Sequence, residues 1–169
     1  MGRVFKERVS ILKIRKIEKE DNIEVKQLIK TVMPEFGACG SGFAINDPEV
    51  ENMFDAYQST QAAYFVVMDE SRIVGTGGIA PLIGGDGKTC ELRKMYFYKE
   101  SRGKGKGKEL LELCLNTAKE LGFTLCYLET LKNMSDAQAL YKKSGFKQLD
   151  KPMGNTGHGG CDMWFIKEL

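Results

Sequence analysis

The spacing of apolar residues divides the chain into two parts that meet near residue 100. In the first part, short alternating or mostly apolar runs end at turn residues, which is typical of strands. A helix capped by Asp21 or Asn22 is expected to end near Met33. A second helix is expected to begin with Asp47 as its N-cap and Pro48 in its first turn. The strands predicted in this part are Leu12–Ile17, Ala62–Met68, Arg72–Ile79 and Cys90–Tyr98.

Helical spacing is prominent in the second part of the chain. Apolar residues recur every three or four positions across residues 106–121, and Gly122 supplies the stop. Another helix is expected to end at Lys143, with Ser135 or Asp136 as its cap. Further strands are predicted at Leu125–Leu128, Phe146–Leu149 and Cys161–Ile166. This order of about seven strands and four helices predicts an α+β fold in which helices flank a mixed sheet.

The composition indicates one globular domain that spans residues 1–169, with 42% hydrophobic and 28% charged residues. Lys and Arg number 25 against 23 Asp and Glu, and this near balance disfavours a nucleic-acid-binding module, which normally carries a strong basic excess. No window approaches the ~20 apolar residues of a membrane span. The charged N-terminal segment lacks the apolar core of a signal peptide and does not fit a myristoylation motif. We therefore expect a cytoplasmic protein with no membrane partner.

Cysteine and histidine content bears on disulfide and metal chemistry. The five cysteines are odd in number and no two of them form a CxxC pair, so a disulfide framework is not expected. His158 is the single histidine of the chain, which disfavours a zinc site. We expect the cysteines to be small buried hydrophobic residues and the protein to bind no metal.

The segment Ser101–Glu109, SRGKGKGKE, follows a predicted strand and opens a predicted helix. Its glycines let consecutive backbone N–H groups turn toward one point, and a helix N-terminus favours an anion. Lys104, Lys106 and Lys108 are unfavourable at that end of the helix by about 0.3–1 kcal/mol each unless an anion is bound. A solvated turn is the alternative, but the strand–loop–helix context favours phosphate binding. The glycine spacing fits neither a P-loop nor a dinucleotide-binding loop.

Two motifs carry a family resemblance. Arg102, Gly105 and Gly107 satisfy the pattern [RQ]xxGx[GA] after the segment Glu91–Phe97, and Leu140–Phe146 reads LYKKSGF. These motifs resemble the acetyl-CoA loop and the fourth-helix motif LYxKxGF of the GNAT superfamily of N-acetyltransferases. The resemblance covers nearly the whole chain and implies a GNAT fold, with a central mixed, mostly antiparallel sheet of about seven strands flanked by four helices.

The resemblance implies acetyl-CoA as co-substrate, with no metal. The chain departs from the family pattern where Lys106 replaces an aliphatic residue and Lys99 replaces a common proline. Met134 stands where many members carry Asn, one place after Asn133. The residues that we assign to the cofactor are Met95, Tyr96, Phe97, Arg102, Gly103, Lys104, Gly105, Lys106, Gly107, Lys108 and Asn133.

Two residues are candidates for the chemistry. Glu91 matches the position of the general base in many GNAT enzymes, and an ion pair with Arg93 or Lys94 is the alternative. Tyr141 matches the position that faces the thioester sulfur and would protonate the leaving thiolate, and an ordinary core aromatic is the alternative. By analogy with the family, the residues assigned to the acceptor side are Ser41, Phe43, Tyr57 and His158. Phe43 and Tyr57 are equally compatible with a place in the core. His158 is equally compatible with an exposed loop that has no role in the chemistry.

We therefore expect direct transfer of an acetyl group from acetyl-CoA to a primary amine, with Glu91 as base through water and Tyr141 as acid. The acceptor is expected to be a small-molecule or peptide amine, and a homodimer is left open. A catalytically silent CoA-binding or sensory domain is the main alternative. A module that binds nucleic-acid phosphates through GKGKGK is a second alternative, which the balanced net charge disfavours.

Overall fold

The computed structural model describes residues 11–169, so most of the N-terminal segment interpreted above lies outside the described residues. The helices within this range are α1 (Asn22–Val32), α2 (Met53–Ala56), α3 (Lys106–Glu120) and α4 (Ser135–Lys143). The strands are β1 (Leu12–Lys16), β2 (Ala63–Asp69), β3 (Arg72–Pro81), β4 (Thr89–Phe97), β5 (Leu125–Thr130), β6 (Lys147–Leu149) and β7 (Met163–Glu168). These elements confirm the predicted strands and helices to within a few residues, except the helix expected from Pro48.

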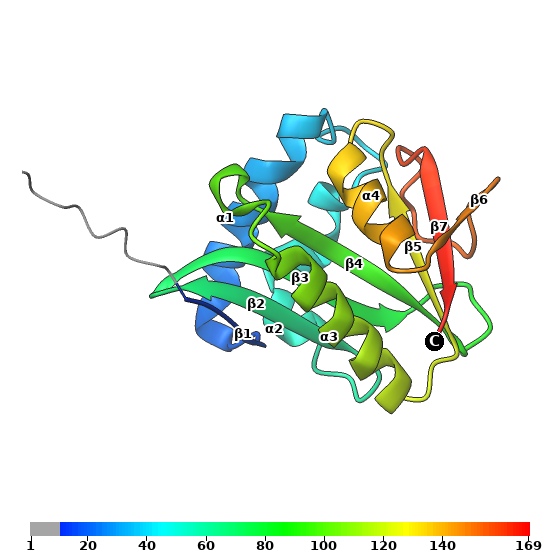
Figure 1. Ribbon diagram of the computed structural model, residues 1–169, viewed down its shortest axis with the longest axis horizontal. Helices are drawn as coiled ribbons and strands as arrows, with labels where there is room; N and C mark the ends of the chain where they lie inside the picture. The colour runs from blue at the N-terminus through cyan, green and yellow to red at the C-terminus, as the bar shows by residue number, and fades with distance from the viewer. Residues whose placement is uncertain (1–10) are drawn as a thin grey trace, which may run out of the picture.

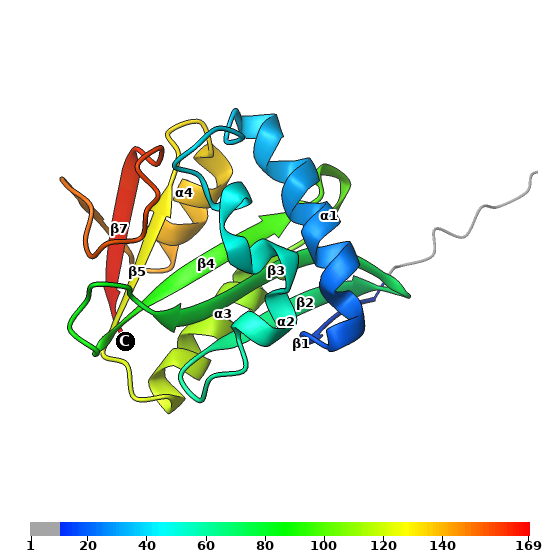
Figure 2. The ribbon, with the colours of Figure 1, turned by 180° about the vertical axis from the view of Figure 1, so that it is seen from behind.

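The strands form one seven-stranded sheet in the order β1-β2-β3-β4-β5-β7-β6. Neighbouring strands are antiparallel except β4 and β5, which are parallel and paired from Thr89–Leu125 to Glu91–Tyr127. Helices α3 and α4 lie on the face of the sheet seen in Figure 1, and α1 and α2 cover the opposite face seen in Figure 2. The predicted α+β class, with helices flanking a mostly antiparallel sheet, is confirmed.

Each face of the sheet packs its own hydrophobic core. The core beneath α3 includes the fully buried Leu110, Leu111 and Cys114, spaced at helical intervals. The core beneath α1 includes Val25, Leu28 and Ile29, which are also buried. The apolar stripes read from the sequence are therefore the surfaces that hold the helices on the sheet.

A bulge in β4 gives the sheet its most consequential irregularity. The register with β3 shifts between Thr76 and Gly78, and Lys94 on β4 has a φ of +47°, an uncommon conformation for a residue other than glycine. The Tyr64 hydroxyl donates a hydrogen bond of 2.9 Å to the Lys94 carbonyl. Because the described pairing of β4 with β5 ends at Glu91, the two strands form a wedge beyond that residue.

Asp21 and Asp47 occupy the predicted N-cap positions, but neither side chain caps its helix because each carboxylate has stronger partners. Asp21 accepts hydrogen bonds from Arg15 at 2.6 and 2.8 Å and makes no side-chain cap at the start of α1. Asp47 makes no cap either, since its carboxylate binds Lys94 and His158. A charge-assisted bond is roughly twice as strong as a neutral one, so the ion pairs prevail over the caps.

The helix predicted from Pro48 is broken into two short pieces. Residues Pro48–Glu51 form a short 3₁₀ turn, and α2 starts afterwards with Asn52 as its cap, accepting from the Asp55 N–H at 3.2 Å. The proposed caps Ser135 and Asp136 are also wrong, because Met134 occupies the N-cap position of α4 without a side-chain bond.

The expectations from composition are met in part. Cys90, Cys114 and Cys126 are buried as predicted, whereas Cys161 is half-buried and Cys39 is exposed in a loop. Across residues 11–169, no helix combines the length and apolar character that crossing a membrane requires.

Candidate active site

A cavity of about 540 Å³ opens where β4 and β5 diverge, between α3 and α4. Its wall combines the end of β4 and the loop that leads to α3 with the start of α4, which lies much further along the chain. Most of the residues predicted to bind the cofactor line it: Met95, Tyr96, Phe97, Arg102, Gly103, Gly105, Gly107, Lys108 and Asn133. The structure therefore gathers the two sequence motifs around one space.

The glycine-rich loop turns at two residues with left-handed backbone. Gly103 has a φ of +74° and Gly105 a φ of +78°, and Gly105 is the N-cap residue of α3. This geometry directs the positive end of the α3 dipole toward the cavity, which suits a phosphate. Lys104 and Lys106 are absent from the cavity wall, and the Lys106 ammonium instead pairs with Glu109 at 2.6 Å.

Arg102 fastens this loop to the chain around it. Its Nε donates to the Phe97 carbonyl at 3.0 Å, and its terminal nitrogen donates to Glu35 at 2.9 Å. The guanidinium also lies over the Phe36 ring, 5.3 Å from the centroid. Asn133 reaches the same segment, donating to the Phe36 carbonyl at 2.9 Å. Both side chains thus help to hold one rim of the cavity.

Tyr141 on α4 lies at the inner end of this cavity and is almost fully buried against Phe146 and Phe165. Burial raises the pKa of its hydroxyl, so Tyr141 stays protonated at neutral pH. Within residues 11–169 its hydroxyl has no hydrogen-bond partner. The hydroxyl oxygen is not fully buried, so it keeps some accessible surface. The side chain is both a core aromatic and a free donor facing open space.

A second, smaller cavity of about 60 Å³ continues inward from the first. The two share Met95, Tyr96, Met134, Ala137 and Tyr141 in their walls. Beyond Tyr141, Phe43 and Cys161 cover the small cavity, and Glu129 on β5 lines it. The small cavity therefore adjoins the larger one at Tyr141.

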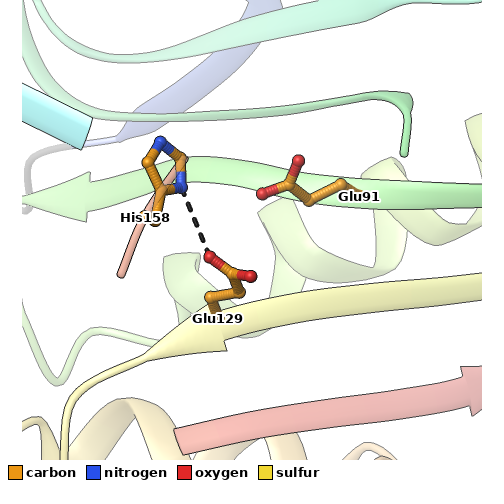
Figure 3. Close-up of side chains that lie close together, drawn as sticks. All are labelled: Glu91, Glu129 and His158. Atoms are coloured by element: carbon orange, nitrogen blue, oxygen red, sulfur yellow. Dashed lines mark ion pairs between the residues drawn. The ribbon is translucent and has the colours of Figure 1, made fainter. Parts of the chain in front are cut away.

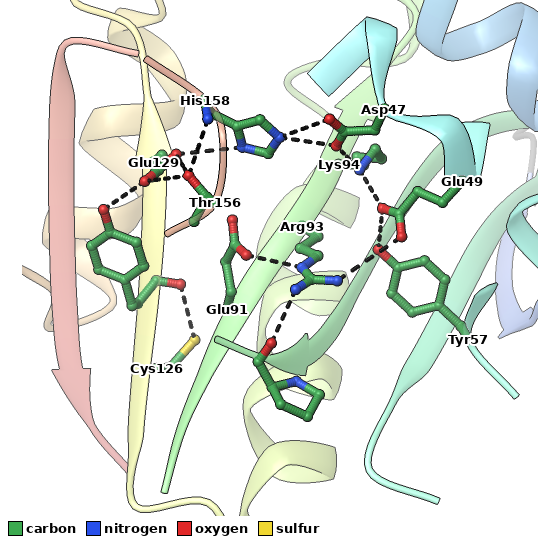
Figure 4. Close-up of polar contacts among 12 residues, drawn as sticks. Asp47, Glu49, Tyr57, Glu91, Arg93, Lys94, Cys126, Glu129, Thr156 and His158 are labelled. Carbon is green, nitrogen blue, oxygen red and sulfur yellow. Dashed lines mark hydrogen bonds and ion pairs between the residues drawn. The ribbon is translucent and has the colours of Figure 1, made fainter. Parts of the chain in front are cut away.

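Seven charged side chains gather beside the small cavity, and we call them the charge cluster (Figure 4). They come from the loop before α2, from β4, from β5 and from the loop before β7. All of them are half-buried or buried. The members are Asp47, Glu49, Glu91, Arg93, Lys94, Glu129 and His158.

Glu91 forms the ion pair that the sequence left as an alternative, with Arg93. The Arg93 Nε donates to one Glu91 oxygen at 2.9 Å, while another Arg93 nitrogen donates to the Pro81 carbonyl at 3.0 Å. Burial raises the pKa of Glu91, and the charge of Arg93 opposes that shift. The other Glu91 oxygen has no hydrogen-bond partner among the described residues. Glu91 lines neither cavity directly and points toward His158 in Figure 3.

His158 is held between two carboxylates. Its Nε2 lies 2.9 Å from an Asp47 oxygen, and its Nδ1 lies 3.4 Å from a Glu129 oxygen. Burial lowers the pKa of the imidazole, but hydrogen bonds with Asp47 and Glu129 raise it, to about 9 overall. His158 is therefore an imidazolium at neutral pH, which excludes it as the general base there.

Glu129 is the site residue that the sequence analysis missed. Its carboxylate accepts hydrogen bonds from Tyr127 at 2.7 Å and from Thr156 at 2.9 and 3.0 Å, in addition to its pairing with His158. Strand alternation could have indicated it. Tyr127 is the register partner of Glu91, and Glu129 lies two residues after Tyr127, so the side chains of Glu129 and Glu91 point to the same side of the sheet. That signal requires knowing that β4 and β5 are neighbours.

The predicted acceptor residues separate into two groups. Phe43 and His158 lie at the small cavity or in the charge cluster beside it. Tyr57 is part of the core, with its ring 4.8 Å from that of Tyr64 and its hydroxyl bonded to Glu49 at 2.9 Å. Ser41 is exposed and lines neither cavity.

Glu91, Glu129 and His158 each bring one potential ligand atom within 4.8 Å of the others (Figure 3). A metal ion would have to displace the pairing of His158 with Asp47 and Glu129, since both of its ring nitrogens face carboxylates. Arg93 already neutralises Glu91. The donor set fits protons and cationic side chains better than a metal, and a metal-free site stays our prediction.

Comparisons with known proteins agree with this geometry. Residues 25–146 match the model of the acetyltransferase (GNAT) family. The chain is 39% identical over 157 residues to the uncharacterized N-acetyltransferase YjgM of Escherichia coli (strain K12), covering 92% of this chain and 94% of that protein.

Solved structures share the fold. An acetyltransferase of the GNAT family from Staphylococcus aureus Mu50 superposes with a TM-score of 0.81 at 23% identity, covering 94% of this chain and 99% of that one. The acetyltransferase yncA from Salmonella typhimurium, solved with its cofactor acetyl-CoA, superposes with a TM-score of 0.75 at 17% identity, covering 93% of each chain.

Proposed function

This chain belongs to the acetyltransferase (GNAT) family, and on that premise we propose that it transfers an acetyl group from acetyl-CoA directly to a primary amine. The observation that carries the proposal is the cavity of about 540 Å³, with a glycine-rich helix N-terminus in its wall and Tyr141 at its inner end. Its size and its anion-binding loop suit a long phosphorylated thioester. The structure of yncA with acetyl-CoA, on the same fold, supports this choice of ligand.

In this proposal the pyrophosphate binds the N–H groups of the loop Arg102–Lys108, and the pantetheine arm lies along Met95–Phe97. Beyond Glu91, the edge of β4 that faces β5 has no ladder partner among the described strands. Backbone N–H groups there are available to the pantetheine arm and to the oxyanion that develops on the thioester carbonyl.

Glu91 serves as the base. An alkylammonium with a pKa near ~10.4 must lose a proton before it can attack a thioester. The free Glu91 oxygen accepts that proton through water, since Glu91 does not line the cavity itself. Arg93 keeps the carboxylate charged, and burial raises its pKa, which makes it a stronger base than an exposed glutamate.

Tyr141 serves as the acid. The CoA thiolate leaves with a conjugate-acid pKa of ~8.5, and a neutral phenol next to it donates a proton to the sulfur. The unpaired, protonated hydroxyl of Tyr141 at the junction of the two cavities supports this role. No covalent enzyme intermediate is needed, because the cavities hold amine and thioester together.

The test is release of free CoA thiol from acetyl-CoA in the presence of a panel of amines, with mass spectrometry of the amine products. We expect turnover above the amine-free hydrolysis rate with at least one amine, and a product 42 mass units heavier, roughly the mass an acetyl group adds in place of hydrogen. CoA binding without turnover would support the silent CoA-binding domain instead. Failure to bind CoA would overturn the proposal.

A further inference from the structure

Two segments far apart in sequence close over the small cavity, and we call residues 38–47 and 154–161 together the acceptor wall. The Gly160 N–H donates to the Gly42 carbonyl at 3.0 Å. The Phe43 ring packs so closely on Gly160 that a Cβ there would lie 2.5 Å from it. Asp47 and His158 pair across the same junction at 2.9 Å (Figure 4). A backbone bond, a ring contact and an ion pair therefore join the two segments.

The acceptor wall leaves little space beneath it. The small cavity measures about 60 Å³, room for roughly four water molecules at ~15 Å³ each. Its lining is mostly apolar, and within residues 11–169 Lys94 and Glu129 are its charged members. The two bridged segments and the volume of about 60 Å³ leave room beneath the wall for a small group, which disfavours an extended peptide acceptor.

Each cation of the charge cluster already has a carboxylate partner. Arg93 pairs with Glu91, Lys94 with Asp47 and Glu49, and His158 with Asp47 and Glu129. Four carboxylates face three cations, which leaves one negative charge in excess. The site therefore favours one further positive charge over a negative one.

The Glu91 oxygen without a hydrogen-bond partner is available to that charge through water, since Glu91 lines neither cavity. The one fully sealed, unpartnered side-chain oxygen or nitrogen in the described chain is Thr89 Oγ1. The free oxygen of Glu91 therefore keeps some accessible surface, although the side chain is only 4% exposed. A carboxylate this buried gains much from an ammonium and is strongly disfavoured beside a second anion.

From the acceptor wall and the charge cluster we infer that the acceptor is a compact small-molecule amine with a single positive charge and no carboxylate or phosphate next to the amine. This inference rests on the proposed acetyl transfer and narrows its acceptor. Amino acids are disfavoured by charge, polyamines by their additional charges, and peptides by the wall.

The experiment compares kcat/KM for acceptors that differ in one property at a time. Isopentylamine is leucine without its carboxylate, and leucinamide restores the size of leucine without its negative charge. Pentylamine and 1,5-diaminopentane differ by one ammonium, and a leucine-initiated tetrapeptide tests chain length. We expect kcat/KM to be at least tenfold higher for isopentylamine than for leucine, with leucinamide between them. We also expect a higher kcat/KM for pentylamine than for 1,5-diaminopentane, and for isopentylamine than for the tetrapeptide.

If leucine or the tetrapeptide is turned over as fast as isopentylamine, the inference is wrong, while the proposed acetyl transfer still stands. Release of no CoA with any of the compounds would overturn the proposed function itself. The two failures are therefore distinguishable in one assay.

A variant tests whether the acceptor wall sets the size limit. His158→Gln removes the imidazolium that joins Asp47 to Glu129, and Lys151→Gln changes an exposed residue nearby, outside the wall. We expect the ratio of tetrapeptide to isopentylamine turnover to rise at least threefold in His158→Gln and to stay at the wild-type value in Lys151→Gln. An unchanged ratio in His158→Gln would contradict the size limit assigned to the wall.

Discussion

Glu91 and Arg93 lie two positions apart on β4, and the Arg93 Nε donates a hydrogen bond of 2.9 Å to one Glu91 oxygen. Strand alternation places both side chains on one side of the sheet, where Arg93 also binds the Pro81 carbonyl. The pair fixes the orientation of the carboxylate while leaving its second oxygen free. It also means that a change at Glu91 affects both charge balance and chemistry.

The first prediction separates these two effects. Glu91→Gln keeps the shape of the side chain but cannot accept a proton, so the rate at neutral pH should fall by roughly 10²–10⁴-fold. The rate should recover in part as the pH rises toward ~10.4, where the amine loses its proton unaided. The measurement is the pH–rate profile together with the melting temperature. A purely structural Glu91 gives a lower melting temperature and a profile of unchanged shape, and the exposed Glu120→Gln serves as the control.

The second prediction concerns the leaving group. Tyr141→Phe removes only a hydroxyl without a hydrogen-bond partner in the described chain, so packing and melting temperature should be preserved. Turnover should fall by roughly 10²–10⁴-fold while CoA affinity stays the same. Tyr98→Phe, at a tyrosine outside both cavities, is the matched control. Wild-type turnover in Tyr141→Phe would mean that the thiolate leaves unaided.

The third prediction tests the glycine-rich loop. Gly105→Glu places a negative side chain in open space at the cavity, where it would repel phosphates. CoA should raise the melting temperature of the wild type and should not raise that of the variant. Gly87 has nearly the same φ, +77° against +78°, and equally open surroundings in a turn outside both cavities. Gly87→Glu therefore controls for backbone strain and should keep the CoA response. Equal CoA affinity in both variants would contradict the assignment of the loop.

The fourth prediction follows from the charge of His158. Its pKa is raised from 6.5 to about 9, so its ion pairs stabilise the fold fully below pH 6.5 and lose their contribution as the pH rises through 9. The difference in free energy of unfolding between wild type and His158→Gln should narrow by up to about 3 kcal/mol over that range. Denaturant unfolding at pH 6, 7.5 and 9.5 measures it. A difference independent of pH would contradict a protonated His158, and Lys151→Gln should show no such trend.

Local patterns predicted the strands, most of the helices and the glycine-rich turn before α3, because their causes are local. The glycines of Arg102–Lys108 and the apolar stripe of α3 need no distant partner to be read correctly. Tyr141 was found because its motif lies within one helix and the turn that follows it.

The charge cluster could not be read in the same way. Asp47 resembles a helix cap in sequence, but its partners are 47 and 111 residues away, at Lys94 and His158. Lys94 turns inward because of the bulge in β4, and a single sequence does not reveal that bulge. Glu129 gains its meaning from the parallel neighbour β4, whose pairing with β5 no local pattern specifies. Long-range pairing was therefore the information that the sequence analysis lacked.

The short pairing of β4 with β5 also has a mechanical meaning. Three residue pairs, from Thr89–Leu125 to Glu91–Tyr127, make up the described ladder that joins strands β1 to β4 to strands β5 to β7. The sheet therefore consists of two parts, which we call leaves, joined by this short ladder. The large cavity lies where β4 and β5 separate. A molecule that fills the cavity touches β4 of one leaf and α4, which follows β5 of the other, and therefore bridges the two leaves. The stiffness of the protein, and the cooperativity with which its two leaves unfold, should consequently depend on whether the cavity is occupied.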